Sequence, residues 1–222
     1  MGFENPERER TIPPSAIQTR PRRWRERADP AEIRTEAIRK SIHLVIALIP
    51  LLATLNRTLT LILLAAGTCV YIASETLRRR GIRVPIVSAL TAASARNRDS
   101  GKFILGPVTL GTGAFLSLLL FPEPAASIAI YTLAFGDSFS SLIGKTVGRI
   151  PMPFTRGKSL EGSLACFTVT FASALAITAR PGPSAIVALV STLVEGLPLK
   201  DWDNIVLPLA AGITSILVYR LA

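Results

Sequence analysis

The chain has 222 residues, of which 49% are hydrophobic and only 6% aromatic, and it carries a formal net charge of +10. Because its apolar residues are mostly Leu, Ile, Val and Ala, the composition suits helices embedded in lipid better than a soluble core. Cys69 and Cys166 both fall in apolar runs, which argues against a disulfide framework or a zinc site. The basic excess fits nucleic acid, anionic lipid or phosphate ligands, so the positions of the charges must decide between them.

The first 35 residues are polar and rich in proline, with a basic cluster from Arg20 to Arg27. They contain no apolar segment of the kind that forms the centre of a secretory signal. We therefore predict a basic cytoplasmic tail over residues 1–35 and a transmembrane catalytic domain over residues 36–222. The tail is expected to contact anionic membrane lipids.

Seven apolar runs follow the tail, each close to the ~17–25 residues that a membrane-spanning helix needs. They cover residues 41–56, 58–77, 104–121, 125–144, 161–179, 184–199 and 204–221. The sixth run is the weakest, with Glu195 and Pro198 near its end, and we expect it to be short, tilted or half-inserted. The pattern predicts an all-α, polytopic integral membrane protein with about seven transmembrane helices.

The distribution of Lys and Arg predicts the orientation. With a cytoplasmic N-terminus, 22 of the 25 Lys and Arg residues fall on the cytoplasmic side, and Arg57, Arg180 and Arg220 fall on the other. This arrangement satisfies the positive-inside rule. We therefore expect a protein of the cytoplasmic or an ER-type membrane with its active site on the cytoplasmic side. Orientation largely explains the net charge, so we predict no nucleic-acid partner.

Under this topology, six of the seven runs carry ionisable residues toward one level of the membrane. These residues are Arg39, Lys40, His43, Glu75, Asp137, Glu161, Glu195 and Asp203, with Asn204 beside the last. Helix caps and interfacial ion pairs would account for several of them singly. Asp137 is harder to explain in that way, because an acid inside an apolar span is costly and usually faces a partner or a polar cavity. The remaining run carries three glycines, which permit close helix packing within a chain or between chains, so an oligomer is left open.

The loop after Asp137, residues 144–160, combines glycines with basic residues. Gly144, Gly148 and Gly157 allow backbone N–H groups to approach phosphate oxygens. The loop also contains Lys145, Arg149, Arg156 and Lys158, and Ser159 opens the next helix, whose N-terminus favours anions. The alternative is a positively charged cytoplasmic loop that binds nothing.

Acidic residues stand at both ends of this loop. Phosphates that bind together with Mg²⁺ need one or two carboxylates, and Asp137 and Glu161 are suitably placed, with Asp203 as a third candidate. A lipid alcohol would reach such a site sideways from the inner leaflet, and a carboxylate near its hydroxyl could accept the proton. Asp137 is the first choice for this base, and Glu161 or Asp203 the second.

At this point a family resemblance emerges from motifs in a fixed order between residues 39 and 208. They are RKSIH (39–43), ETLR (75–78), GDSFSSLIG (136–144), Gly148, KSLEGSLA (158–165), Glu195 and DNIVLP (203–208). In these motifs the chain resembles the CTP-dependent lipid kinases, which include dolichol (polyprenol), phytol and farnesol kinases and the yeast-type diacylglycerol kinase, and which are related to the phosphatidate cytidylyltransferases. The pair GD and KSLEG carries most of the specificity.

The resemblance implies CTP as phosphoryl donor, a divalent metal and a nucleotide site between GD and KSLEG. We therefore predict Asp137, Lys158 and Glu161 as catalytic residues and Asp137, Glu161 and Asp203 as ligands of Mg²⁺. The residues predicted to bind CTP are Lys40, His43, Gly136, Gly144, Lys145, Arg149, Arg156, Ser159, Glu195 and Asn204.

The function expected is a membrane lipid kinase that moves the γ-phosphoryl group of CTP to a lipid alcohol. The acceptor would be a polyprenol, a phytol-type isoprenoid or diacylglycerol. One alternative is transfer of CMP to a lipid phosphate. The Lys-Asp and His-Gly-Gly elements of that branch are absent, and the single histidine is His43. A second alternative is a transporter or scaffold whose acids relay protons or ions.

Overall fold

The structure is a computed structural model that describes residues 29–221, with gaps at residues 83, 86–90, 92–101, 154 and 156. Its helices are α1 (Pro30–Val45), α2 (Ile49–Arg79), α4 (Gly106–Leu120), α5 (Ala125–Tyr131), α6 (Asp137–Thr146), α7 (Leu160–Thr178), α8 (Pro181–Glu195) and α9 (Asp203–Leu221). Short helical turns lie at Ile46–Leu48, Thr132–Gly136 and Lys200–Trp202. The described residues form no sheet, apart from one isolated β-bridge, so the all-α prediction is confirmed.

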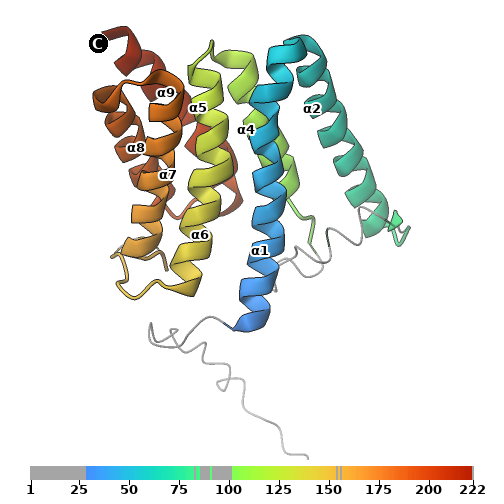
Figure 1. The fold of residues 1–222 in the computed structure, drawn as a ribbon. Coiled ribbons are helices and arrows are strands. Elements are labelled where there is room, and N and C mark those ends of the chain that lie inside the picture. The colour runs from blue at the N-terminus through green and yellow to red at the C-terminus, as the bar shows by residue number, and fades with distance from the viewer. Residues whose placement is uncertain are drawn as a thin grey trace, which may run out of the picture.

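Local sequence signals explain where several helices begin and turn. The side chain of Asp29 accepts a hydrogen bond from Ala31 N (2.9 Å) and caps α1, and Ser159 caps α7 by accepting from Gly162 N (3.1 Å). Asn56 has φ −159° and ψ 100°, which breaks the helical path inside α2. The predicted boundary between the first two apolar runs falls at this break, and Figure 1 shows the chain reversing direction near it.

The helices stand side by side as a bundle (Figure 1). The most buried of the membrane-length stretches is Ala125–Thr146, which contains α5 and α6. Beside it, α7 packs against α6 and α8, and α9 packs against α8, α4 and α5. The apolar core contains small residues such as Ala126, Ala129 and Ala211, which allow the helices to approach closely. By contrast, α2 packs mainly against α4 at the edge of the bundle and exposes many apolar side chains, as lipid contact requires.

Four helical stretches are long and apolar enough to cross a membrane: Pro30–Arg79, Ala125–Thr146, Leu160–Thr178 and Lys200–Arg220. The first of these is 50 residues long and contains the break at Asn56. Gly106–Leu120 and Pro181–Glu195 are apolar but shorter. All seven predicted runs therefore fall on helix and the integral membrane class is supported, while the number of seven spans stays a prediction.

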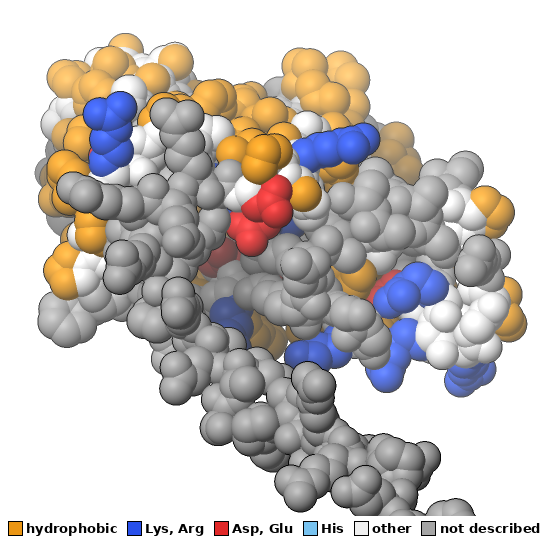
Figure 2. Space-filling view, turned by 90° about the horizontal axis from the view of Figure 1, so that it is seen from below, with side chains coloured by type: hydrophobic (Ala, Val, Ile, Leu, Met, Phe, Trp, Pro, Cys, Tyr) orange, Lys and Arg blue, Asp and Glu red, His pale blue; other side chains and the backbone are white. Residues whose placement is uncertain are grey.

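The predicted division between a tail and a transmembrane domain at residues 35 and 36 stays a prediction. Residues 1–28 of the predicted tail lie outside the described residues, and residues 30–35 form the first turns of α1, so this helix crosses the predicted boundary. In Figure 1, α1 begins at one end of the bundle and α9 finishes at the opposite end. Viewed from the end where α1 begins, charged side chains gather on the face and hydrophobic side chains cover the flanks (Figure 2).

Candidate functional site

Asp137 is the first residue of α6 and lies directly after a π-helical turn. Its backbone N–H donates to the carbonyl of Thr132, five residues earlier, so the helix from Ala125 to Thr146 is locally widened just before the acid. Such π-turns inside helices are frequent at functional sites. The side chain of Asp137 is only 5% exposed, which requires a compensating charge nearby.

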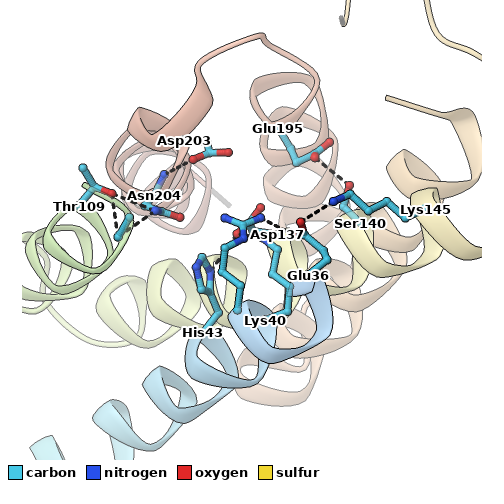
Figure 3. A network of polar contacts seen from close by, with 12 residues as sticks. Glu36, Lys40, His43, Thr109, Asp137, Ser140, Lys145, Glu195, Asp203 and Asn204 are labelled. Carbon is cyan, nitrogen blue, oxygen red and sulfur yellow. Dashed lines mark hydrogen bonds and ion pairs between the residues drawn. The ribbon is translucent and has the colours of Figure 1, made fainter. Parts of the chain in front are cut away.

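That compensation comes from α1 (Figure 3). Lys40 donates a hydrogen bond to Oδ2 of Asp137, and Nδ1 of His43 lies 3.0 Å from the same oxygen. Lys40 and His43 are buried, as is Asp137. These three residues therefore lie together between α1 and α6: Lys40 forms an ion pair with Asp137, and His43 lies beside the same carboxylate oxygen.

A second acid on α1 extends this cluster and was not predicted from the sequence. One carboxylate oxygen of Glu36 accepts a hydrogen bond from Arg39, and the other accepts from Nζ of Lys145 at 2.5 Å. Glu36, Lys40 and His43 have the spacing i, i+4 and i+7, which places them on one helix face. That spacing was the signal in the sequence that could have identified Glu36.

Lys158 and Glu195 form the next part of the network. Nζ of Lys158 lies 2.7 Å from Oε1 of Glu195 and also donates to the Glu195 carbonyl, and Oγ of Ser140 donates to the same carboxylate oxygen at 2.7 Å. Ser140 lies one turn after Asp137 on α6. Polar contacts therefore join the basic loop to the end of α8 and the end of α8 to the Asp137 helix. Figure 3 shows the second of these contacts, between Ser140 and Glu195.

On α9, Asn204 and Asp203 have different surroundings. Nδ2 of Asn204 donates to Oγ1 of Thr109 (2.9 Å), and the residue is buried against α4. Gly113 makes this contact possible, because a Cβ atom there would lie 1.9 Å from the Asn204 carbonyl oxygen. Asp203 interacts electrostatically with Asp137, Lys40 and Lys158, so it faces the same site from α9.

Glu161 organises the loop instead of joining Asp137. Its carboxylate accepts hydrogen bonds from the backbone N–H groups of Arg149 (2.9 Å) and Ile150 (3.2 Å). The loop closes on itself through the β-bridge between Pro151 and Ser159. Glu161 thereby fixes the path of the backbone that leads to Lys158.

Three glycines permit the close packing of this region. A Cβ on Gly148 would lie 2.2 Å from the Gly144 carbonyl oxygen, and a Cβ on Gly136 would lie 3.0 Å from Oγ1 of Thr170. Among the predicted nucleotide-binding residues, Gly136 thus packs against α7 and Gly144 packs against Ser159, the cap of α7. Arg149 is exposed on the loop. Arg156 lies outside the described residues.

The three predicted metal ligands do not assemble into one group. Among the residues that the structure describes, no cluster of three His, Cys, Asp or Glu side chains is arranged to hold a metal ion. The oxygens of Glu161 are engaged by the loop amides, whereas Asp137 and Asp203 face the same site. A metal held by one or two carboxylates and by substrate phosphates would fit the latter pair.

The comparisons with known proteins give the family context. The chain is 28% identical over 157 residues to the "Probable phytol kinase 1, chloroplastic" of Oryza sativa subsp. japonica, which is 63% of this chain and 50% of that protein. It is 24% identical over 157 residues to "Phytol kinase 1, chloroplastic" of Arabidopsis thaliana, covering 63% of this chain and 52% of the relative. It is 26% identical over 127 residues to "CTP-dependent diacylglycerol kinase 1" of Saccharomyces cerevisiae, covering 46% and 44%.

No family profile matches the chain, and no solved structure matches it significantly. The chain spans about half the length of the curated relatives that it matches. Both phytol kinases and a CTP-dependent diacylglycerol kinase are among them, as the motif pattern predicts. The resemblance inferred from the sequence is therefore confirmed: the chain is similar to phytol kinases and to a CTP-dependent diacylglycerol kinase.

Proposed function

We propose that the protein is a membrane kinase that transfers the γ-phosphoryl group of CTP to the hydroxyl group of a lipid. The observation that carries this proposal is the buried ion-paired cluster of Asp137, Lys40 and His43. On the same helix as Asp137, Ser140 contacts Glu195, which binds Lys158, and all these groups lie at one end of apolar, membrane-length helices. Phosphoryl transfer needs positioned cations and few covalent steps by the protein, which matches this set of groups.

In the proposed reaction, the lipid oxygen forms a bond to the γ-phosphorus. The bond from that phosphorus to the β,γ-bridging oxygen breaks, and CDP leaves. The proton of the lipid hydroxyl passes to a carboxylate, for which we assign Asp137, because it is buried at the centre of the cluster. Lys40, Lys145 and Lys158 are assigned to the phosphate oxygens, and Asn204 holds α9 in position through Thr109.

A bound Mg²⁺ would supply charge neutralisation of the phosphates. Asp137 and Asp203 are the residues that we assign to hold it, because both face the same site and because Mg²⁺ typically takes only one or two carboxylates from the protein. Glu161 is assigned to the loop, since its oxygens already accept backbone hydrogen bonds.

For the acceptor, we propose an isoprenoid alcohol of the phytol or polyprenol type, with diacylglycerol as the alternative. The relatives named as phytol kinases and as a diacylglycerol kinase support these two classes. The distribution of Lys and Arg supports a cytoplasmic active site and contact of the basic segments with anionic lipids. The alcohol would enter from the adjoining leaflet.

The position of the radioactive label in CTP tests this proposal. Purified protein in lipid vesicles is incubated with Mg²⁺, with phytol, a polyprenol or diacylglycerol, and with CTP labelled at either the α- or the γ-phosphate. We expect lipid labelling from γ-labelled CTP alone, and none with Asp137→Asn. Labelling from the α-phosphate would instead show CMP transfer, and unlabelled lipid with folded protein and intact CTP would reject the kinase.

A further inference from the structure

The cytoplasm-facing part of α1 contains an acid that the proposed reaction does not use. Glu36 accepts from Arg39 on its own helix and from Lys145 on α6, so one carboxylate joins two cations from two helices. Resting on the proposed function, we propose that Arg39 and Lys145 form a subsite for the phosphate groups of the nucleotide. In this subsite Glu36 is the positioning residue.

The exposure of the three side chains is unequal. The side chain of Glu36 is 1% exposed, whereas those of Arg39 and Lys145 are 15% and 32% exposed. A dissolved anion therefore reaches the cations without displacing the carboxylate, which lies beneath them. The three groups together retain one positive charge, so the subsite still attracts phosphate.

Arg39 also has an unused donor. Its Nε is buried and lacks a hydrogen-bond partner among the described residues, although the guanidinium group donates through a terminal nitrogen to Glu36. A guanidinium group can bind two phosphate oxygens at once through adjacent N–H groups. An unpaired buried donor is costly, and a phosphate oxygen would satisfy it.

The geometry of the two helices explains why a positioning acid is needed. Lys145 lies in the last turn of α6, about two turns after Asp137, and α1 packs along α6. Glu36 binds Lys145 while Lys40 binds Asp137, so each helix contributes one acid and one base to the contact. Without Glu36, the repulsion among Arg39, Lys40 and Lys145 would move the cations apart.

The ligand class that fits this arrangement is a polyphosphate. Arg39 is adjacent to Lys40, which binds the proposed base, so a phosphate chain bound at Arg39 and Lys145 would lie alongside the reacting group. The alcohol has no charge that would use these cations. The subsite therefore predicts an effect on CTP and none on the lipid.

The closing experiment measures steady-state kinetics of Glu36→Gln, with Glu32→Gln on the exposed preceding turn of α1 as the matched control. For Glu36→Gln we expect the KM for CTP to rise about tenfold, with kcat and the KM for the lipid each within about threefold of the wild type. Glu32→Gln should match the wild type. Because Glu36 acts partly through Lys145 and partly through Arg39, adding Glu36→Gln to Lys145→Gln should raise the KM for CTP by clearly less than the tenfold rise expected in the wild-type background.

Three results would overturn the proposal. The first is an unchanged KM for CTP in Glu36→Gln, and the second is a lower KM, which would mean that Glu36 competes with the phosphates for the cations. The third is that Glu36→Gln and Lys145→Gln change the KM independently of each other. If Glu36→Gln does not fold, Glu36→Asp is the second variant, because it keeps the charge on a shorter side chain. Its KM for CTP should lie between the wild-type value and ten times that value. A wild-type KM for CTP in Glu36→Asp would contradict the subsite.

Binding of inorganic tripolyphosphate, measured by its effect on thermal unfolding, separates this inference from the proposed function. A wild-type protein that transfers no phosphoryl group would sink the kinase proposal. The subsite would still stand if tripolyphosphate stabilised the wild type and Glu32→Gln but not Glu36→Gln. Equal stabilisation of all three proteins would remove the subsite even in an active kinase.

Discussion

The two ends of the helix bundle handle their polar side chains in opposite ways. At the Asp137 end, Glu36, Asp137 and Glu195 are buried acids that bind Lys or Arg side chains from other parts of the chain. At the other end, the cations bind backbone oxygens: Arg57 donates to the carbonyls of Leu118 (2.5 Å) and Phe121 (2.9 Å). At the second end, which we call the capped end, side chains donate to carbonyls at helix ends, whereas buried ion pairs between helices occur at the first end.

The opposite end is also more fully paired. The hydroxyl of Tyr219 lies 2.9 Å from Ser184 Oγ and 3.2 Å from Thr178 Oγ1, and Arg180 donates to the Tyr219 carbonyl at 3.2 Å. At the Asp137 end, the buried polar atoms that lack hydrogen-bond partners among the described residues include Arg39 Nε, Ser138 Oγ, Glu195 Oε2 and Asn204 Oδ1. Most buried polar groups in proteins are paired, so the unpaired atoms need an explanation, and the ligand that we propose for this end would provide it.

The strongest test of this contrast is Asp137→Asn, which keeps the shape of the side chain and removes its charge. We expect the rate of phosphoryl transfer to fall at least about 100-fold, the usual effect of losing a general base. Glu123→Gln changes an exposed acid at the opposite end and should leave the rate unchanged. The measurement is transfer of γ-label to lipid, and a rate for Asp137→Asn within about threefold of the wild type would contradict the assignment.

The next largest effect is expected at the contact between α4 and α9. In Gly113→Ala, the new Cβ would lie 1.9 Å from the Asn204 carbonyl oxygen, and this backbone atom cannot move without shifting α9. We expect a loss of stability of about 1–3 kcal/mol, typical of overpacking. Gly67→Ala on α2 is the control, because no atom lies within 4 Å of its Cβ position.

The stability of both glycine variants is measured by thermal unfolding in detergent, followed with a dye that does not react with thiols. Gly67→Ala should be as stable as the wild type or slightly more stable, since alanine favours a helix by about 0.5–1 kcal/mol over glycine. Equal stability of the two variants would show that α4 and α9 are not packed as closely as this structure places them.

The sequence alone predicted much of the fold because the membrane imposes a simple rule. A lipid-embedded helix must be apolar over its length, so the seven runs could be found by composition, and the break at Asn56 lies between the first two. The ends were harder to place. The third and sixth runs became helices of 15 residues. In the sixth, Pro181 fixes where α8 starts, and Gly196 follows its end.

The site was predictable where a motif holds its residues together. Lys40 and His43 were predicted from RKSIH and Asp137 from GDSFSSLIG, and these residues lie in contact. Glu36 was missed because it lies in no motif and pairs with Lys145, 109 residues away. The choice of partner depends on which helix faces pack together, and this packing is not evident from a single sequence.

Glu161 is a second residue whose contacts could not be predicted from its position in the sequence. Its position beside the basic loop predicted a metal ligand, but its oxygens accept from the amides of Arg149 and Ile150. A carboxylate in the first turn of a helix is also well placed to bind neighbouring N–H groups of a returning loop. Sequence order gives closeness along the chain, not the direction of the side chain.

Lys158→Gln should have a smaller effect than the loss of Asp137. We expect the KM for CTP to rise about tenfold, or about 1.4 kcal/mol, because one phosphate-binding cation is lost. Lys200→Gln is the matched control: this residue is an exposed lysine at the start of the short helical turn between α8 and α9. Kinetics at varied CTP check the prediction, and identical KM values for the two variants would remove Lys158 from the site.

The smallest effect is expected at the capped end, from Tyr219→Phe. The substitution removes the hydroxyl shared by Ser184 and Thr178 but keeps the ring that the Arg180 guanidinium approaches at 5.9 Å. The loss of stability should be about 0.5–1.5 kcal/mol, with the KM for CTP unchanged, because these hydrogen bonds hold helix ends together and touch no substrate. Tyr131→Phe, whose ring stacks on Phe135, is the control for loss of a tyrosine hydroxyl. A changed KM for CTP in Tyr219→Phe would mean that the two ends of the bundle are coupled, and the division between a capped end and a binding end would have to be abandoned.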